Sequence, residues 1–146
     1  MVKPSQQQQS ITRGCVFGAT HDATFEFWID DKPKWKRCLA FGLTPPSDDE
    51  DAHYFIGTSN VNRFTEQPLL MTDCLIFEAG SYPFFPEKTA IDFSELCIVP
   101  MEMLRKKGLK TLGHMSATDI ERCAKVIAEA RILPNKHKKL LGLANS

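Results

Sequence analysis

Residues 37–59 read RCLAFGLTPPSDDEDAHYFIGTS and decide the fold that the rest of the chain must fit. The run at 38–43 is short and apolar, which is typical of a strand buried on both faces. The Thr-Pro-Pro at 44–46 ends this strand, because proline has no N–H to donate to a neighbouring strand. Residues 48–51 are consecutive carboxylates that repel one another and stay in water. Residues 53–57 return as a second strand, so the stretch predicts a hairpin.

Polar residues stand at the two outer ends of this predicted hairpin. Arg37 opens the first strand, and Thr58 with Ser59 closes the second. If the strands pair antiparallel, both ends lie at the same edge of the sheet. A guanidinium and two hydroxyls suit an oxyanion such as a phosphate. We therefore expect a phosphate-binding site there.

Other apolar segments bounded by turn residues occur on both sides of the hairpin. Several of them alternate polar and apolar residues, which is the pattern of a half-buried strand. Further strands are expected at 11–18, 24–29, 73–77, 88–93 and 96–99, with a segment at 60–72 that is mainly loop.

Helical signals are concentrated near the C-terminus. Ser116 and Asp119 form a capping box, and Pro134 stops the helix that follows it. Helices are expected at 101–107, 116–133 and 136–141, with 109–113 as a connection.

The order of these elements predicts the fold class. Strands come first and helices later, which favours a mainly β fold with appended helices, of the α+β class. We expect a small, strongly bent antiparallel sheet or barrel with a C-terminal helix. A chain of 146 residues favours a single domain. This domain is expected at 11–146, after a polar tail at 1–10 that is disordered alone.

The overall charge gives no sign of a nucleic-acid partner. Lys plus Arg is 18 and Asp plus Glu is 18, so the formal net charge is zero. An RNA-binding role must then rest on a local basic patch such as 32–37, 105–110 or 136–139. The sequence has no recognisable signal peptide and no run of about 18 apolar residues, so we expect a cytoplasmic protein without a membrane span.

The chain has five cysteines, which lie far apart and include no C-x-x-C pair. Neither a zinc site nor a disulfide framework is indicated, and we expect buried thiols in a reducing compartment. No metal or cofactor is expected. An alternative is a cysteine nucleophile, Cys38 or Cys15, near His21 or His53.

Five short segments, in order, resemble the PemK/MazF group of toxin–antitoxin ribonucleases. The opening R-G-D-V strand of the family is similar to Arg13-Gly14-Cys15-Val16, with cysteine in place of aspartate. The family's R-P-x-L-V strand is similar to 36–41, with Cys38 in place of proline. Its I-T-S, S-x-V and I-G-x-L-S segments resemble 56–59, 88–91 and 112–116.

This resemblance implies an SH3-like barrel that cuts single-stranded RNA without a metal. It also implies a homodimer that a cognate antitoxin inhibits. In such cleavage the ribose 2′-hydroxyl attacks the neighbouring phosphorus. Arg37 would then neutralise the extra charge, and Thr58 and Ser59 would orient the phosphate.

The same reaction needs a general base and a surface for the bases of the RNA. Imidazole titrates near neutral pH, so His21 and His53 are attractive catalytic candidates. The candidates for the base are His21, His53, Glu26 and Asp30. Trp35 stands between Lys34 and Lys36 and is the best candidate for stacking on an unpaired base, with the two lysines as further RNA-binding residues.

A second hypothesis is a binding module without catalysis. SH3-like barrels bind peptides or nucleic acids in many settings, and a fold alone does not fix a function. The sequence has no clear counterpart of the family's acidic residue before Arg37 or of its Arg/Asp pair in a later loop. These departures favour the binding module, and both hypotheses stay open at this point.

Overall fold

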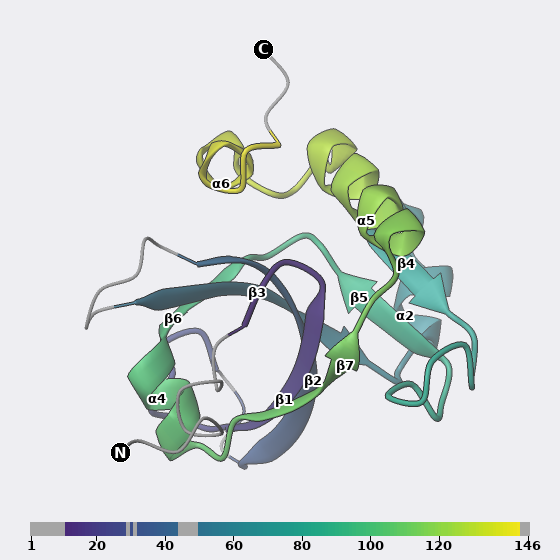
Figure 1. Ribbon diagram of the computed structural model, residues 1–146. Coiled ribbons are helices and arrows are strands. Elements are labelled where there is room, and N and C mark those ends of the chain that lie inside the picture. Colours follow the sequence, from purple (N-terminus) through teal and green to yellow (C-terminus); the bar gives the residue numbers. More distant parts are fainter. Residues whose placement is uncertain (1–10, 29, 31, 44–49, 144–146) are drawn as a thin grey trace.

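The computed structural model describes residues 11–28, 30, 32–43 and 50–143. The tail at 1–10 and most of the acidic turn inside the central hairpin lie outside these residues. The described chain is mainly β, with a seven-stranded antiparallel sheet and several short helices (Figure 1).

The strands follow one another across the sheet in the order β4-β5-β3-β2-β1-β7, and β6 also pairs with β3. Within the described chain the outer strands β4 and β7 do not pair, so the bent sheet is not closed into a barrel. The strands are β1 (Cys15–His21), β2 (Lys34–Leu43), β3 (Asp51–Thr58), β4 (Cys74–Phe77), β5 (Thr89–Asp92), β6 (Cys97–Pro100) and β7 (Lys110–His114). The helices are α2 (Asn62–Thr65), α3 (Pro68–Met71), α4 (Met101–Lys106), α5 (Ala117–Glu129) and α6 (Asn135–Leu140).

The central hairpin is confirmed, and its first strand is buried on both faces. β2 and β3 pair antiparallel, with Cys38 opposite Ile56. On one face of β2, Leu39 and Phe41 join a core that includes residues of α5 and Leu141, which follows α6. On the other face, Cys38 and Ala40 join a second core that includes residues of β6 and α4. The chain needs both cores to cover this one strand.

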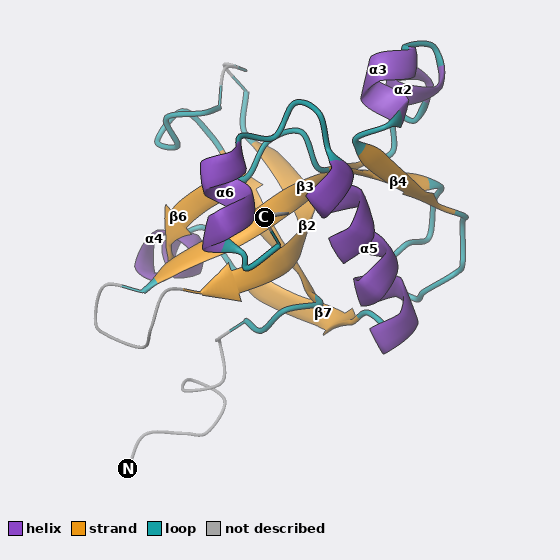
Figure 2. Ribbon diagram, turned by 90° about the horizontal axis from the view of Figure 1, so that it is seen from above, coloured by secondary structure: helices purple, strands orange, loops and turns teal. Residues whose placement is uncertain are grey.

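The helices lie on the two sides of the sheet accordingly. Figures 1 and 2 show α5 and α6 together over one side, and α4 at the opposite side beside β6. Buried Cys123 and Ile127 of α5 pack into the first core, and Met101 and Leu104 of α4 pack into the second.

The predicted strand at 24–29 is wrong, since residues 22–28 form successive turns. The Asp22 carboxylate accepts hydrogen bonds from the Thr24 N–H at 3.0 Å and from the Thr24 hydroxyl. The N–H of Trp28 then donates to the carbonyl of Phe25 at 3.0 Å. Such an Asx turn competes with strand pairing. The aromatic residues that looked strand-like gather around His21 instead.

Other element boundaries also differ from the sequence prediction. The first strand begins at Cys15 rather than at residue 11, because Gly14 has φ 93° and turns the chain. The predicted connection at 109–113 is mostly strand β7. This edge strand is exposed apart from Leu112, whose side chain is half-buried. The predicted loop at 60–72 contains the two single-turn helices α2 and α3.

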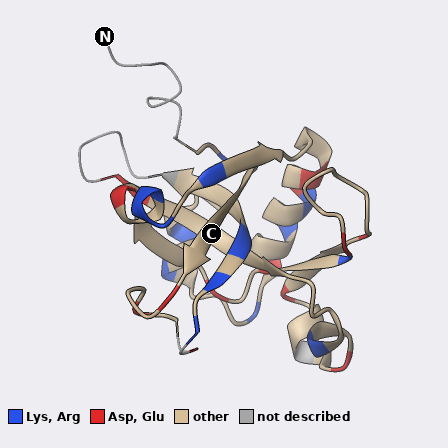
Figure 3. Ribbon diagram, turned by 90° about the horizontal axis from the view of Figure 1, so that it is seen from below, with Lys and Arg blue, Asp and Glu red and all other residues tan. Residues whose placement is uncertain are grey.

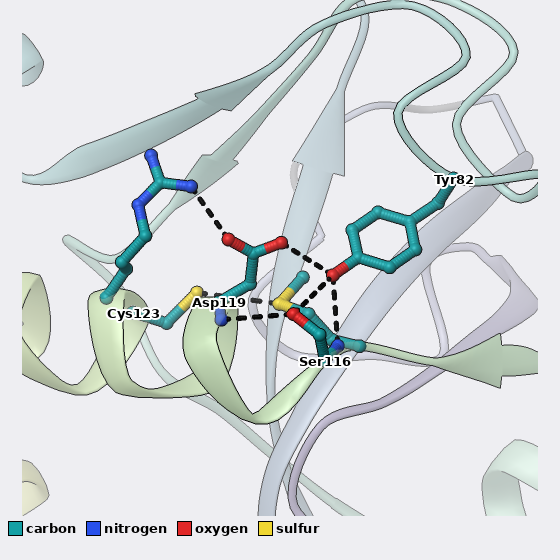
Figure 4. A network of polar contacts seen from close by, with 6 residues as sticks. Tyr82, Ser116, Asp119 and Cys123 are labelled. Carbon is teal, nitrogen blue, oxygen red and sulfur yellow. Dashed lines mark hydrogen bonds and ion pairs between the residues drawn. The ribbon is translucent and has the colours of Figure 1, made fainter.

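The predicted N-terminus of the main helix is confirmed, because Ser116 caps α5 and accepts a hydrogen bond from the Asp119 N–H at 3.2 Å. The Asp119 carboxylate does not accept a hydrogen bond from the Ser116 N–H, as the third residue of a full capping box would. It accepts hydrogen bonds from the Tyr82 hydroxyl at 2.5 Å and from Arg122 at 2.7 Å (Figure 4). The Tyr82 bond is the main cause of the lowered pKa of Asp119. The loop before β5 is thereby fixed to the start of α5.

α5 ends at Glu129, four residues before the predicted end at Leu133. Buried charged side chains form hydrogen bonds with the backbone at this end. The Asp73 carboxylate is fully buried and accepts hydrogen bonds from the N–H groups of Arg131 at 2.9 Å and Ile132 at 2.8 Å. The Lys138 ammonium donates to the carbonyls of Ala128 and Ala130 at 3.2 and 2.6 Å. These bonds turn the chain out of the helix before Pro134 can do so.

We expect Asp73→Asn to lower the free energy of unfolding by about 2 kcal/mol, because an amide nitrogen would face a backbone N–H in a buried site. Urea denaturation of the two proteins measures this difference. Glu78→Gln, at an exposed position, is the matched control and should change the free energy by less than about 0.5 kcal/mol. An Asp73→Asn protein as stable as the wild type would contradict the structural role of this carboxylate.

Candidate functional site

Arg37 and Trp35 form a stacked pair on the first part of β2. Arg37 lies within the strand opposite Gly18, rather than at the start of the strand as predicted, since β2 begins at Lys34. The ring of Trp35 covers Gly18 and remains 44% exposed. The guanidinium carbon of Arg37 lies 5.1 Å from the centroid of this ring. The pair therefore places a cation beside an accessible aromatic ring.

A small hollow of about 90 Å³ lies between β2, the end of β3 and the start of β5, and we call it the Arg37 hollow. It brings together the three residues that the sequence predicts for a phosphate site, Arg37, Thr58 and Ser59. The antiparallel register of β2 and β3 accounts for this convergence. The lining residues are Trp35, Lys36, Arg37, Gly57, Thr58, Ser59, Glu87 and Thr89.

The hydrogen-bonding groups of the Arg37 hollow are only partly satisfied. The Nε of Arg37 is buried without a partner, and Arg37 makes no ion pair with any described residue. The Thr58 Oγ1 accepts a hydrogen bond from the Asn60 N–H at 3.1 Å, as in an ordinary exit from a strand. The Thr58 O–H can still donate, and Ser59 is exposed. The hollow thus offers a cation and hydroxyl donors to a bound oxyanion.

Glu87 adds a carboxylate to the same hollow, which the sequence analysis missed. It is exposed and lies two residues before β5, and its carbonyl accepts a hydrogen bond from the Thr89 hydroxyl at 2.8 Å. Glu87 reaches the hollow because β5 pairs with β3, with Thr58 opposite Ala90. A pairing of distant segments gives no local signal in the sequence.

His21 does not line the Arg37 hollow, and its side chain is not accessible to solvent. It ends β1 instead of lying in a turn, and its side chain is fully buried. Its Nδ1–H donates to the Ala19 carbonyl at 3.0 Å, which leaves Nε2 to accept the Tyr54 hydroxyl at 2.8 Å. Burial is the main cause of its lowered pKa. Both nitrogens are engaged, so the structure gives His21 no open position from which to act as a base.

His53 lies elsewhere as well. It is five residues before Thr58 on β3, about 16 Å along a strand. Only 3% of it is exposed, and its Nε2 is buried without a hydrogen-bond partner in the described part of the chain. Burial lowers its pKa, and the charge of His137 on α6 lowers it further against the opposing effect of Asp51. The structure therefore does not bring His53 together with Arg37.

The two carboxylates considered near the hairpin differ in setting. Glu26 is exposed within the turns before β2. Asp30 forms an ion pair with Lys34 at 2.9 Å. Neither of them lines the Arg37 hollow.

Lys36 links the Arg37 hollow to a larger hollow of about 330 Å³, which we call the Trp28 hollow. Lys34 and Thr58 also line the larger hollow. The pKa of Lys36 is lowered, first by burial and then by the nearby charge of Lys34. Basic and acidic residues are interspersed along the ribbon (Figure 3), and both hollows are lined by charges of both signs.

The five thiols are all buried, and burial raises the pKa of each of them. The thiolate is the reactive form of cysteine, so these residues are poor nucleophiles. Cys38, the cysteine nearest in sequence to Arg37, packs in the second core. The geometry gives no support to a cysteine-dependent reaction.

The two buried histidines make stability depend on pH. Their folded-state pKa values are lowered, so the unfolded chain, with a histidine pKa of about 6.5, binds more protons just below that pH. The free energy of unfolding should therefore be highest above pH 6.5 and fall as the pH drops toward 5, by up to about 1.4 kcal/mol per unit for each histidine. Urea denaturation at a series of pH values measures this loss. His53→Gln should show a smaller loss than wild type, whereas His114→Gln, at an exposed position, should not. Equal losses in wild type and His53→Gln would overturn this assignment.

A substitution at Gly18 tests the stacked pair without replacing Arg37 or Trp35. A Cβ at Gly18 would lie 1.9 Å from Cζ2 of Trp35, so Gly18→Ala must displace the ring. In a Trp28→Phe background, we expect the Trp35 emission to shift to longer wavelength and the free energy of unfolding to fall by about 1 kcal/mol. Thr111→Ala, at an exposed position of the neighbouring β7, should do neither. An unchanged emission in Gly18→Ala would contradict the packing of Trp35.

No family model, curated protein or solved structure matches this chain. Among the described residues there is no cluster of three or more His, Cys, Asp or Glu able to hold a metal ion. None of the described helices is long and apolar enough to cross a membrane.

Proposed function

We propose that the protein binds single-stranded RNA at the Arg37 hollow and cleaves the backbone of the RNA. The observation that carries this proposal is the set of groups around one small hollow: an arginine without an ion pair to any described residue, two hydroxyls and a carboxylate. Cleavage by an internal 2′-hydroxyl needs charge stabilisation and proton transfer at one phosphate, and these groups supply both.

Each group has a role in such a reaction. Glu87 accepts the proton of the ribose 2′-hydroxyl as its oxygen attacks the phosphorus. Arg37 stabilises the added negative charge, while the Thr58 and Ser59 hydroxyls donate to phosphate oxygens. The bond from phosphorus to the 5′-oxygen breaks, and this oxygen leaves with a proton from the Lys36 ammonium, whose pKa burial lowers. The products are a 2′,3′-cyclic phosphate and a 5′-hydroxyl end.

Trp35 accounts for a preference for unpaired RNA. Its ring is 44% exposed beside the hollow, where a base of a single strand can stack on it. A base in a duplex is already stacked and paired, so it does not offer its face in this way.

The finer parts of the proposal come from the resemblance to PemK/MazF toxins. The bent antiparallel sheet with a C-terminal helix is compatible with an SH3-like barrel that does not close among the described strands. By the same resemblance we propose a cytoplasmic homodimer whose activity a cognate antitoxin blocks. Metal independence belongs to this part of the proposal too.

Substitutions in the Arg37 hollow test the reaction. We expect Arg37→Ala to lower kcat/KM for single-stranded RNA by about 10²- to 10³-fold, because it removes the charge that stabilises the transition state. Glu87→Gln should lower the rate by about 10²- to 10⁴-fold through loss of the base. Cleavage of an end-labelled RNA with chelator present, followed by analysis of the product ends, measures both effects.

Matched controls lie on the exposed surface of the helices. Arg105→Ala and Glu121→Gln change the same residue types away from the hollow and should cut RNA like the wild type. Wild-type products with 5′-phosphate ends, or full activity of Arg37→Ala, would show that the proposed reaction is wrong.

A second candidate function is RNA binding without cleavage. One observation favours it, since both histidines considered for the base are buried away from Arg37. In that case RNA would bind with an affinity that depends on Arg37 and Trp35, and it would stay intact at every pH from 5 to 9.

A further inference from the structure

The Trp28 hollow has the size and the lining of a ligand site. Its volume of about 330 Å³ falls within the range of small-molecule pockets, about 300 to 1,000 Å³. Trp28 and Phe27 form part of its wall, and Ile56 and Cys97 add further apolar surface. Apolar and aromatic walls are usual in such sites, and here they are joined by three cations and three carboxylates.

The aromatic wall is held in place by the protein. The Trp28 ring packs 5.7 Å from the buried ring of His21, and the Trp28 indole N–H donates to the Lys32 carbonyl at 3.2 Å. His21 is itself fixed by its hydrogen bond to Tyr54. A ring held from behind in this way can stack on a flat ligand without reorganising.

Two cations of this hollow lack an ion pair in the described chain. Lys36 is half-buried and Arg63 of α2 is exposed, and neither takes part in a salt bridge, whereas Lys34 is paired with Asp30. Burial is the main cause of the lowered pKa of Lys36, and the nearby charge of Lys34 lowers it further while Asp30 raises it. Two available cations match the charge of a phosphate monoester, which is about −1.5 to −2.

Three carboxylates, Asp30, Asp92 and Glu95, line the same hollow as the cations. Lys36 belongs to β2 and Asp92 ends β5, and β3 lies between these strands. Two strand spacings across the sheet and an offset of two residues along it separate their backbones by roughly 12 Å. One oxygen of Asp92 accepts hydrogen bonds from the N–H and hydroxyl of Ser94 at 2.9 and 2.6 Å, which leaves the other oxygen for a ligand donor. Carboxylates accept hydrogen bonds from ribose hydroxyls in other nucleotide sites.

We propose that the Trp28 hollow binds a nucleoside monophosphate, with its base on Trp28, its phosphate at Lys36 and Arg63, and its ribose hydroxyls at Asp92. This inference goes beyond the proposed cleavage and does not depend on it. An aromatic wall, two cations without an ion pair among the described residues, and a carboxylate roughly 12 Å away match the three parts of such a ligand. Inorganic phosphate offers only one of these parts.

Tryptophan emission provides the test, because the chain has two tryptophans and only Trp28 lines this hollow. In a Trp35→Phe background, AMP should quench Trp28. Adenosine should bind at least about tenfold more weakly because it lacks the phosphate, and inorganic phosphate should not quench. Arg63→Ala and Lys36→Met should each weaken AMP binding about tenfold, whereas Arg105→Ala and Lys125→Met should not. If Trp35→Phe does not fold, the two indole N–H signals of the wild type, followed by NMR, give the same titration.

The outcomes separate this inference from the proposed function. Arg37→Ala should still bind AMP even though it cuts RNA much more slowly. Equal affinities for AMP and adenosine, no quenching by millimolar AMP, or no effect of Arg63→Ala would overturn the nucleotide site, whether or not RNA is cleaved. A 5′-phosphorylated RNA oligomer that binds more tightly than AMP would identify the end of a strand as the source of the nucleotide, and equal binding would identify the free nucleotide.

Discussion

The burial of β2 on both faces is the constraint on which the rest of the structure depends. A strand covered on one face only would leave either Leu39 and Phe41 or Cys38 and Ala40 in water. The chain therefore builds a layer on each side, with α5 and α6 over one face and α4 with β6 over the other. A slip of one residue in the register of β2 would exchange these two sets of side chains, so packing fixes the register.

Buried charges complete the layer over the first face, and backbone groups rather than opposite charges stabilise them. Asp73 accepts hydrogen bonds from two N–H groups after α5, and Lys138 donates to two carbonyls at its end. An isolated buried charge is costly, but these hydrogen bonds compensate for the lost water. Arg13 acts in the same way, since its guanidinium donates to the carbonyls of Phe41 and Leu141 and so ties the end of β2 to the C-terminal helix.

The sequence predicts the parts of this fold that have local signals. The hairpin and α5 follow from apolar patterns, a cap and prolines within a few residues of one another. Strand β7 could not be predicted, because an exposed edge strand with only Leu112 partly buried has no apolar alternation. The hollow around Arg37 was predictable from the antiparallel hairpin, but Glu87 was not, since its place depends on the pairing of β3 with β5. The burial of His21 depends on Tyr54, which lies 33 residues away in sequence.

The same strand explains why the two hollows lie next to each other. Arg37 lines the Arg37 hollow, and Lys36, the preceding residue of β2, lines both hollows. In the middle of β2 both faces are covered by core, but before Cys38 the covering layers end and polar side chains replace apolar ones. Thr58 stands at the matching end of β3 and lines both hollows. A nucleic acid strand passing this end of the hairpin would meet a phosphate site on one side and an aromatic, cationic site on the other. β2 is apolar where it is buried and basic at its exposed end. This change along one strand is enough to produce that arrangement.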